Sequence, residues 1–147
     1  MFTLVHPDLS VSQSPLEGIL QQSDKTLLYF YPKNNTPWCT VQATDFVAHS
    51  EAFEKLWIQI VGVSRDWETS HCNFIEKHWL KAQYLSDPEL ILHKQFGTYG
   101  EKNNYGKIVQ WVIRSTFLLD QNWSLLKEWR NVRAKWHVER VLKELRD

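Results

Sequence analysis

The chain has 147 residues, 43% of them hydrophobic, and its 17 acidic side chains balance its 17 basic ones. This size predicts one domain with a substantial core, and the balanced charge gives no global electrostatic case for a nucleic-acid or membrane partner. Two cysteines are too few for a disulfide scaffold, and we find neither a signal-peptide pattern nor an apolar run of about 20 residues, so we expect a cytoplasmic protein.

Hydrophobic periodicity predicts alternating strands and helices along most of the chain. In chain order we expect a strand at 27–31, a helix at 38–56, a strand at 57–63, a helix at about 67–79, a strand at 83–85, a helix at 90–96, a loop at 97–107, strands at 111–119 and 125–129, and a helix at 134–145. Ser64 or Asp66 is the expected N-cap of the second helix. This order predicts a single α/β domain, residues 1–147, with a central mixed β-sheet flanked by helices.

The junction between the first strand and the first helix contains Cys39. The strand stops at Pro32 and a polar turn at Asn34 and Asn35, and Cys39 then opens the helix. A thiol at a helix N-terminus meets unpaired backbone N–H groups and the positive end of the helix dipole, which both favour the nucleophilic thiolate. Thr36 can place a hydroxyl beside the sulfur. The position by itself fits a buried structural cysteine, with Thr36 as an ordinary N-cap, equally well.

The spacing Pro32-x-x-x-Thr36-x-x-Cys39 matches the P-x-x-x-T/S-x-x-C active-site motif of peroxiredoxins. The residues around it, 29–33 and 39–43, resemble the bacterioferritin-comigratory-protein (Q-type) branch of that family. Further segments that resemble this branch follow in the same order at residues 61–64, 85–88, 99–102, 105–107, 113–118 and 129–132. The resemblance covers about residues 27–145, and it favours the nucleophile over the structural cysteine.

The resemblance implies a thioredoxin-like fold, which suits the expected order of elements, and a thiol peroxidase that needs no metal or organic cofactor. Cys39 would attack hydrogen peroxide or an organic hydroperoxide and become a sulfenic acid. Thr36 and the backbone N–H of Cys39 would hydrogen-bond the peroxide, and Pro32 would shield the sulfur from water. Arg114 matches the family's catalytic arginine, and its apolar neighbours on the strand expected at 111–119 predict a side chain that faces the interior.

The thiol that resolves the sulfenic acid is left open by the sequence. Many members of this branch carry a second cysteine five residues after the first, where this chain has Thr44. Cys72 lies three residues before Ile75, the position that matches the resolving cysteine of other members. A disulfide needs Cα atoms within about 7 Å, so we expect that pairing Cys72 with Cys39 requires local unfolding near both cysteines. Resolution is therefore by Cys72 or by an external thiol. The implied reductant is thioredoxin, or glutaredoxin and glutathione if Cys72 is not involved, and the implied assembly is a monomer or a weak dimer.

Three features depart from the family pattern. Residues 1–24 lack the usual opening segment and strand pair, so we treat them as a divergent N-terminal segment. Trp38 stands where the family usually has glycine, and its ring could narrow the peroxide channel, cover the sulfur or pack outward. Tyr99 replaces a frequent tryptophan, an exchange that indicates a packing role.

Other functions have weaker support. His71, Cys72 and His78 share a predicted helix, but no further ligands complete a tetrahedral zinc site. Basic and aromatic residues alternate over 129–136, yet a strand end and a solvated helix start explain them better than a nucleic-acid surface. The alternative to the enzyme is a non-enzymatic thioredoxin-fold redox sensor or binding module, because Trp38 and the altered N-terminus could weaken catalysis.

Overall fold

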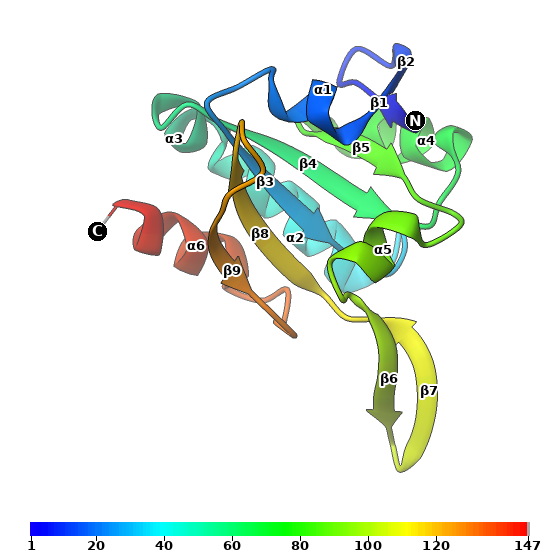
Figure 1. The fold of residues 1–147 in the computed structure, drawn as a ribbon. Coiled ribbons are helices and arrows are strands. Elements are labelled where there is room, and N and C mark those ends of the chain that lie inside the picture. Colours follow the sequence, from blue (N-terminus) through cyan, green and yellow to red (C-terminus); the bar gives the residue numbers. More distant parts are fainter. Residues whose placement is uncertain (147) are drawn as a thin grey trace.

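The computed structural model describes residues 1–146, except for the side chains of residues 102 and 104. Figure 1 shows a central sheet with a separate two-stranded hairpin that projects from the main body. The main sheet has the strand order β2-β1-β5-β4-β3-β8-β9. The strand bounds are β1 (Phe2–Val5), β2 (Val11–Ser14), β3 (Lys25–Phe30), β4 (Ile58–Ser64), β5 (Gln83–Ser86), β8 (Ser115–Asp120) and β9 (Leu125–Trp129), and the hairpin consists of β6 (Tyr99–Asn104) and β7 (Lys107–Val112).

The centre of the main sheet is parallel and its outer pairs are antiparallel. β4 lies between β3 and β5 and runs parallel to both. β8 and β9 extend the sheet antiparallel to β3, and the β1–β2 pair extends it antiparallel to β5. In β3 every residue except Lys25 is buried, as expected for a central strand that is covered on both faces. The predicted mixed sheet is confirmed.

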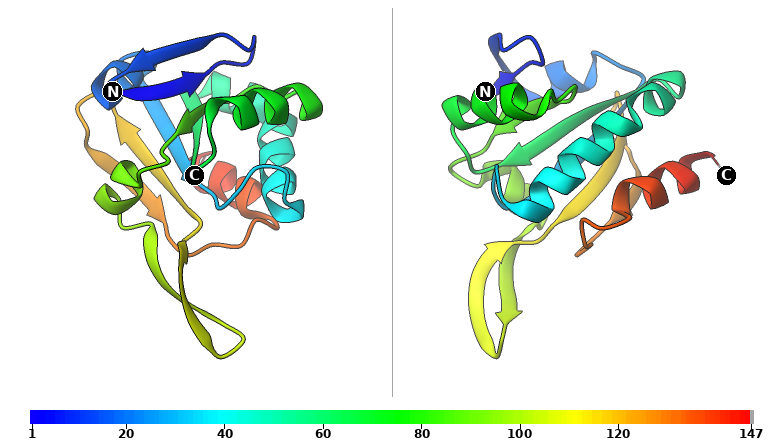
Figure 2. Two further views of the ribbon diagram at one scale, coloured as in Figure 1. Left: turned by 90° about the vertical axis from the view of Figure 1, so that its right-hand side faces the viewer. Right: turned by 180° about the vertical axis from the view of Figure 1, so that it is seen from behind.

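Helices cover both faces of this sheet, as the two views of Figure 2 show. Their bounds are α1 (Leu16–Leu20), α2 (Pro37–Ala48), α3 (Ser50–Lys55), α4 (Glu68–His78), α5 (Ile91–Gln95) and α6 (His137–Arg146). Side chains of α2, α3, α4 and α6 form one buried cluster, and side chains of α1 and α5 contribute to a second. Leu27 and Tyr29 of β3 belong to the first cluster and Leu28 and Phe30 to the second, because successive strand residues point to opposite faces.

The helix expected at 38–56 is two helices. The chain leaves helical geometry at His49, which ends α2 and precedes α3. In one straight helix Phe46 and Phe53 would lie about two turns, or roughly 10 Å, apart along the axis. On the two sides of the break the ring centroids of Phe46 and Phe53 lie 5.8 Å apart, and both rings enter the same buried cluster. Hydrophobic spacing predicted the shared face but not the break.

The prediction for residues 97–119 is wrong in detail. The expected loop contains β6, and the expected long strand is interrupted at Ile113 and Arg114, which connect β7 to β8. The backbone is held there by long-range hydrogen bonds, in which Ile113 N donates to Thr98 O and Val132 N donates to Arg114 O. The hairpin turn has positive φ at Tyr105 and Gly106. Arg114 therefore lies at the base of the hairpin rather than within a strand.

Residues 1–24 contain an antiparallel hairpin and a short helix, so the expectation that this segment lacks a strand pair is wrong. β1 and β2 pair over residues 2–14, and β1 also joins the main sheet beside β5. α1 buries Leu16, Ile19 and Leu20 in the second cluster. Within residues 1–146, no helix has both the length and the apolar composition needed to cross a membrane.

Candidate active site

Cys39 lies in the first turn of α2, just beyond the carboxyl end of β3. The loop of residues 31–36 leads from the strand into the helix, which begins at Pro37. The first helical hydrogen bond runs from Thr40 N to Thr36 O at 2.9 Å, so the N–H of Cys39 precedes it and has no carbonyl partner within the helix. The cysteine is 2% exposed and belongs to the first buried cluster. The sulfur is thus enclosed while the positive end of the helix faces it.

Thr36 and Pro32 flank the same loop. Thr36 is the residue before α2, but its side chain makes no capping bond to the helix. Its hydroxyl instead donates to the carbonyl of Lys33 at 2.9 Å, which leaves the oxygen lone pairs free to accept. Pro32 is partly buried in the bend that follows β3. The alternative that Thr36 is an ordinary side-chain N-cap does not fit this geometry.

Arg114 reaches the sulfur from a distant part of the chain. Its Nη2 lies 3.2 Å from Cys39 Sγ. Its Nη1 donates to the side-chain oxygen of Gln42, one helical turn after the cysteine on α2. A guanidinium placed there brings a permanent positive charge next to the thiol, and this charge favours the thiolate.

Sequence reasoning did not assign a function to Gln42. Its side chain is fully buried, and Oε1 accepts the bond from Arg114. A buried amide on the same helical face as Cys39 was the available signal, since polar side chains in a core need a partner. The partner could not be identified from the helix alone because it lies on the β7–β8 connection.

His137 lies close to Arg114 at the start of α6. Its Nε2 and the Thr116 hydroxyl form a hydrogen bond of 2.8 Å. Burial lowers the pKa of His137 to about 4, and the positive charges of Arg114 and Arg140 act in the same direction. The imidazole is therefore neutral at pH 7, and it adds no second cation beside Arg114.

A polar network anchors the loop before Cys39 to α4. Asn34 Nδ2 donates to Ser70 Oγ at 3.1 Å and to His71 Nδ1 at 3.0 Å, while its backbone N–H donates to Asp66. The Tyr31 hydroxyl donates to Asn34 Oδ1. Burial lowers the pKa of His71 to about 4, which keeps its Nδ1 available as an acceptor at neutral pH. These bonds fix the loop that carries Thr36.

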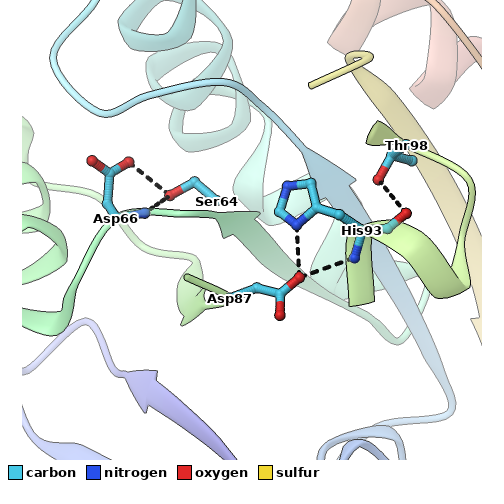
Figure 3. A network of polar contacts seen from close by, with 5 residues as sticks. All are labelled: Ser64, Asp66, Asp87, His93 and Thr98. Carbon is cyan, nitrogen blue, oxygen red and sulfur yellow. Dashed lines mark hydrogen bonds and ion pairs between the residues drawn. The ribbon is translucent and has the colours of Figure 1, made fainter. Parts of the chain in front are cut away.

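Two sets of polar contacts lie at the ends of β4 and β5 (Figure 3), and the backbone N–H of Asp87 joins the two ends by donating to Ser64 O at 2.8 Å. The Ser64 hydroxyl donates to the Asp66 carboxylate at 2.7 Å, so Asp66 holds Ser64 and Asn34 together instead of capping α4. Asp87 accepts bonds from both the backbone N–H and the ring Nδ1 of His93. Burial raises the pKa of Asp87, but the bonds from His93 outweigh it and the net shift is downward. Asp87 and His93 support the sheet end next to the active-site loop.

Cys72 lies on α4 and is partly buried against the cluster that contains Cys39. Both cysteines are free thiols. Thr44, at the position where a resolving cysteine is common, uses its hydroxyl to bond the Thr40 carbonyl of its own helix. The two sulfurs thus share one face of the sheet without being joined.

Trp38, the other departure on this helix, is 56% exposed, so its ring extends outward beside the buried sulfur. Among the described residues, no group of three or more histidine, cysteine or acidic side chains could hold a metal ion.

Comparisons with known proteins agree on one family. A model of the AhpC/TSA family matches residues 2–127. Peroxiredoxin Bcp of Bacillus subtilis is 45% identical over 121 residues, which are 82% of this chain and 77% of that protein. Peroxiredoxin Bcp of Xanthomonas campestris is 41% identical over 120 residues, covering 82% of this chain and 75% of that protein. The solved bacterioferritin comigratory protein of Xanthomonas campestris, studied for alkyl peroxide reduction, superposes with a TM-score of 0.83 at 34% identity and covers 98% of this chain and 89% of its own.

Proposed function

The chain belongs to the AhpC/TSA family, in the Bcp or Q-type branch of the peroxiredoxins, and is a thiol peroxidase with a thioredoxin-like fold; from this premise we propose that Cys39 is its peroxidatic nucleophile. The observation that carries the proposal is the 3.2 Å contact between Arg114 Nη2 and Cys39 Sγ at the N-terminal turn of α2. Helix dipole and guanidinium act on the same sulfur, and both stabilise its anionic form.

In the proposed first step, the Cys39 thiolate donates an electron pair to one peroxide oxygen. The S–O bond forms as the O–O bond breaks, and the departing oxygen leaves as hydroxide or alkoxide and takes a proton from water. Cys39 becomes a sulfenic acid. Negative charge moves from the sulfur to the departing oxygen in this step. Arg114 and the N–H of Cys39 would stabilise this developing charge.

Thr36 and Pro32 have supporting roles in this proposal. The Thr36 hydroxyl proton is committed to the Lys33 carbonyl, so its oxygen would accept a hydrogen bond from the peroxide O–H. Such a bond orients the peroxide with one oxygen toward the sulfur. Pro32 has no N–H to attract water, and its partly buried ring would shield the same approach.

Peroxides and thiol reductants are the reactants of this family, and we propose the finer assignments for this chain. The substrates are hydrogen peroxide and organic hydroperoxides. The sulfenic acid is resolved by Cys72, with thioredoxin as the reductant, or by an external thiol, with glutaredoxin and glutathione. The proposed catalytic unit is a cytoplasmic monomer or weak dimer, in which residues 1–147 form one domain that acts without nucleic acid or membrane.

Two variants test this proposal. Cys39→Ser should abolish thiol-dependent peroxide consumption, because serine cannot supply the thiolate, and Cys72→Ser should retain oxidation by a first equivalent of peroxide. Intact mass after one equivalent of hydrogen peroxide then identifies the resolving step. A loss of two hydrogens in the monomer means that Cys39 pairs with Cys72, and a gain of one oxygen means an external thiol. Peroxidase activity that survives in Cys39→Ser would refute the assignment.

A further inference from the structure

A surface pocket of about 420 Å³ is lined by Arg114, the residue that contacts the buried Cys39 sulfur, and by Trp38, the residue before the cysteine. This volume falls within the range of roughly 300–1,000 Å³ that is typical of small-molecule sites. The pocket lies between the start of α2, the β7–β8 connection and the segment before α6. Its lining residues are Trp38, Arg114, Val132, Arg133, Ala134 and Lys135.

The charged side chains of this lining all have the same sign. Arg114, Arg133 and Lys135 contribute three cations, and no carboxylate lines the pocket within the part of the chain that the structure describes. Arg133 and Lys135 are exposed, and neither forms an ion pair with another described side chain. The ammonium of Lys135 lies 5.7 Å from the centre of the Trp136 ring. The pocket is therefore suited to a small molecule with a negative charge.

The pocket is connected to the reactive sulfur through Arg114. One part of this side chain lines the pocket, while its Nη2 contacts Cys39 Sγ at 3.2 Å. Trp38, which precedes the cysteine, forms another part of the wall. Only 2% of Cys39 is exposed, so a molecule in the pocket reaches the sulfur when a neighbouring side chain moves. Trp38 is half exposed and can turn without leaving the core open.

We propose that this pocket binds a small thiol that carries carboxylate groups and that this thiol reduces the Cys39 sulfenic acid. The inference rests on the proposed role of Cys39. Arg133 and Lys135 would bind the carboxylate, and Trp38 and Val132 would contact the carbon chain. The charge of the thiol would thus determine how well it competes as a reductant.

The proposed step balances as a condensation followed by an exchange. The thiol sulfur attacks the sulfur of Cys39–SOH, an S–S bond forms, the S–O bond breaks, and hydroxide leaves with the thiol proton as water. A second thiolate then attacks the outer sulfur of the mixed disulfide. The products are the oxidised small-molecule disulfide and the Cys39 thiolate. Both electrons come from the external thiols.

The second half of the cycle is the half that requires such a pocket. Hydrogen peroxide is small and neutral, so it gains little from distant cations. The helix that carries Cys39 has Thr44 and not a second thiol, and Cys72 lies on another helix. A small thiol that resolves Cys39 from solution therefore gains from its own recognition site near the sulfur.

The test separates the two half-reactions in full-length protein, with and without Cys72→Ser. Cys39 is oxidised with one equivalent of hydrogen peroxide, and its reduction by 3-mercaptopropionate or by uncharged 2-mercaptoethanol is followed by stopped flow. Rate constants are expressed per thiolate. The quantity compared is the rate constant for 3-mercaptopropionate divided by the rate constant for 2-mercaptoethanol. We expect this ratio to fall roughly tenfold in the double variant Arg133→Gln/Lys135→Gln. It should also fall in the unaltered protein when salt is raised to about 0.5 M.

The control variant Lys55→Gln/Lys77→Gln removes the same charge from exposed positions on α3 and α4 and should keep the ratio of the unaltered protein. A ratio that is equal in the pocket variant and the unaltered protein would overturn the inference. The rate of Cys39 oxidation is also measured with a carboxylate-bearing and with an uncharged hydroperoxide. If the pocket variant changes the ratio of these two oxidation rates and leaves the reduction step unchanged, the pocket serves the peroxide and the inference is overturned. If Cys39 is not oxidised at all, the proposed function fails together with the inference.

Discussion

The Arg114 guanidinium has two partners on α2, and they have different roles. Cys39 Sγ is the reacting atom, whereas Gln42 Oε1 holds the other end of the guanidinium. Arginine is a long side chain with several rotatable bonds, so a second hydrogen bond restricts where its charge can lie. Gln42 is buried and one turn from the cysteine, so the bond that it accepts is fixed to the same helix as the sulfur. We therefore infer that Gln42 is a positioning residue.

Replacing Gln42 by methionine should slow the oxidation of Cys39 by hydrogen peroxide roughly tenfold, because Arg114 loses the bond that orients it. Rapid-mixing fluorescence measures this rate in the purified protein. Gln83→Met, a similar exchange on β5 away from the sulfur, is the matched control. An unchanged oxidation rate in Gln42→Met would contradict the positioning role.

At the scale of elements, two tyrosines from the outer strands β3 and β5 contact each other across a glycine in the middle strand β4. Tyr29 of β3 and Tyr84 of β5 are the neighbours of Gly62 of β4 in the sheet register. Their hydroxyls hydrogen-bond to each other across β4 within the buried cluster. A Cβ on Gly62 would lie 2.5 Å from Tyr84 Cε1 and 3.0 Å from Tyr29 Cζ. Glycine fits at position 62 because the two tyrosine rings occupy the space that a larger side chain there would need.

Gly62→Ala should therefore lower the free energy of unfolding by about 1–3 kcal/mol, since both buried rings must move to admit a methyl group. Urea denaturation followed by tryptophan fluorescence provides the measurement. Gly100→Ala in β6 serves as the control, because its added Cβ would meet only Ile113 Cδ1, at an ordinary 3.9 Å. Equal stability of the two variants would contradict the proposed crowding.

At the scale of the whole molecule, two buried histidines link folding to pH. His71 joins α4 to the active-site loop, and His137 joins α6 to β8. Burial is the main cause that lowers each pKa to about 4, against about 6.5 for an unfolded histidine. Between these values the unfolded chain takes up protons that the folded protein does not. The stability that the neutral rings contribute is thus present above about pH 6.5 and is lost as the pH falls toward 4.

We expect the free energy of unfolding to decrease from pH 7 to pH 5 by on the order of 2 kcal/mol for each of the two histidines. Urea titrations at intervals across this range measure the slope. In His71→Gln, whose glutamine oxygen can still accept a bond from Asn34, the slope should be about half as steep. A stability that stays level between pH 7 and pH 5 would show that these rings are not neutral in the folded protein.

The local part of the candidate site could be predicted because it is contiguous. Pro32, Thr36 and Cys39 lie on one loop and one helical turn, so the sequence could place Cys39 at the start of a helix, while the role of the Thr36 hydroxyl stays a prediction. Arg114 could be assigned only through family resemblance, and its expected place within a strand was wrong. The partnership with Gln42 could not be predicted, because a helical pattern identifies a buried position without identifying what lies opposite.

The sequence by itself determined the alternation of strands and helices, the apolar faces, and a cysteine at the start of a helix. These properties follow from backbone preferences and side-chain periodicity over a few residues. The tertiary structure decided the break at His49, the hairpin of β6 and β7, the contact between Arg114 and Cys39, and the cationic pocket beside them. The contact and the pocket depend on residues far apart in the chain, where packing and long-range hydrogen bonds outweigh local preference.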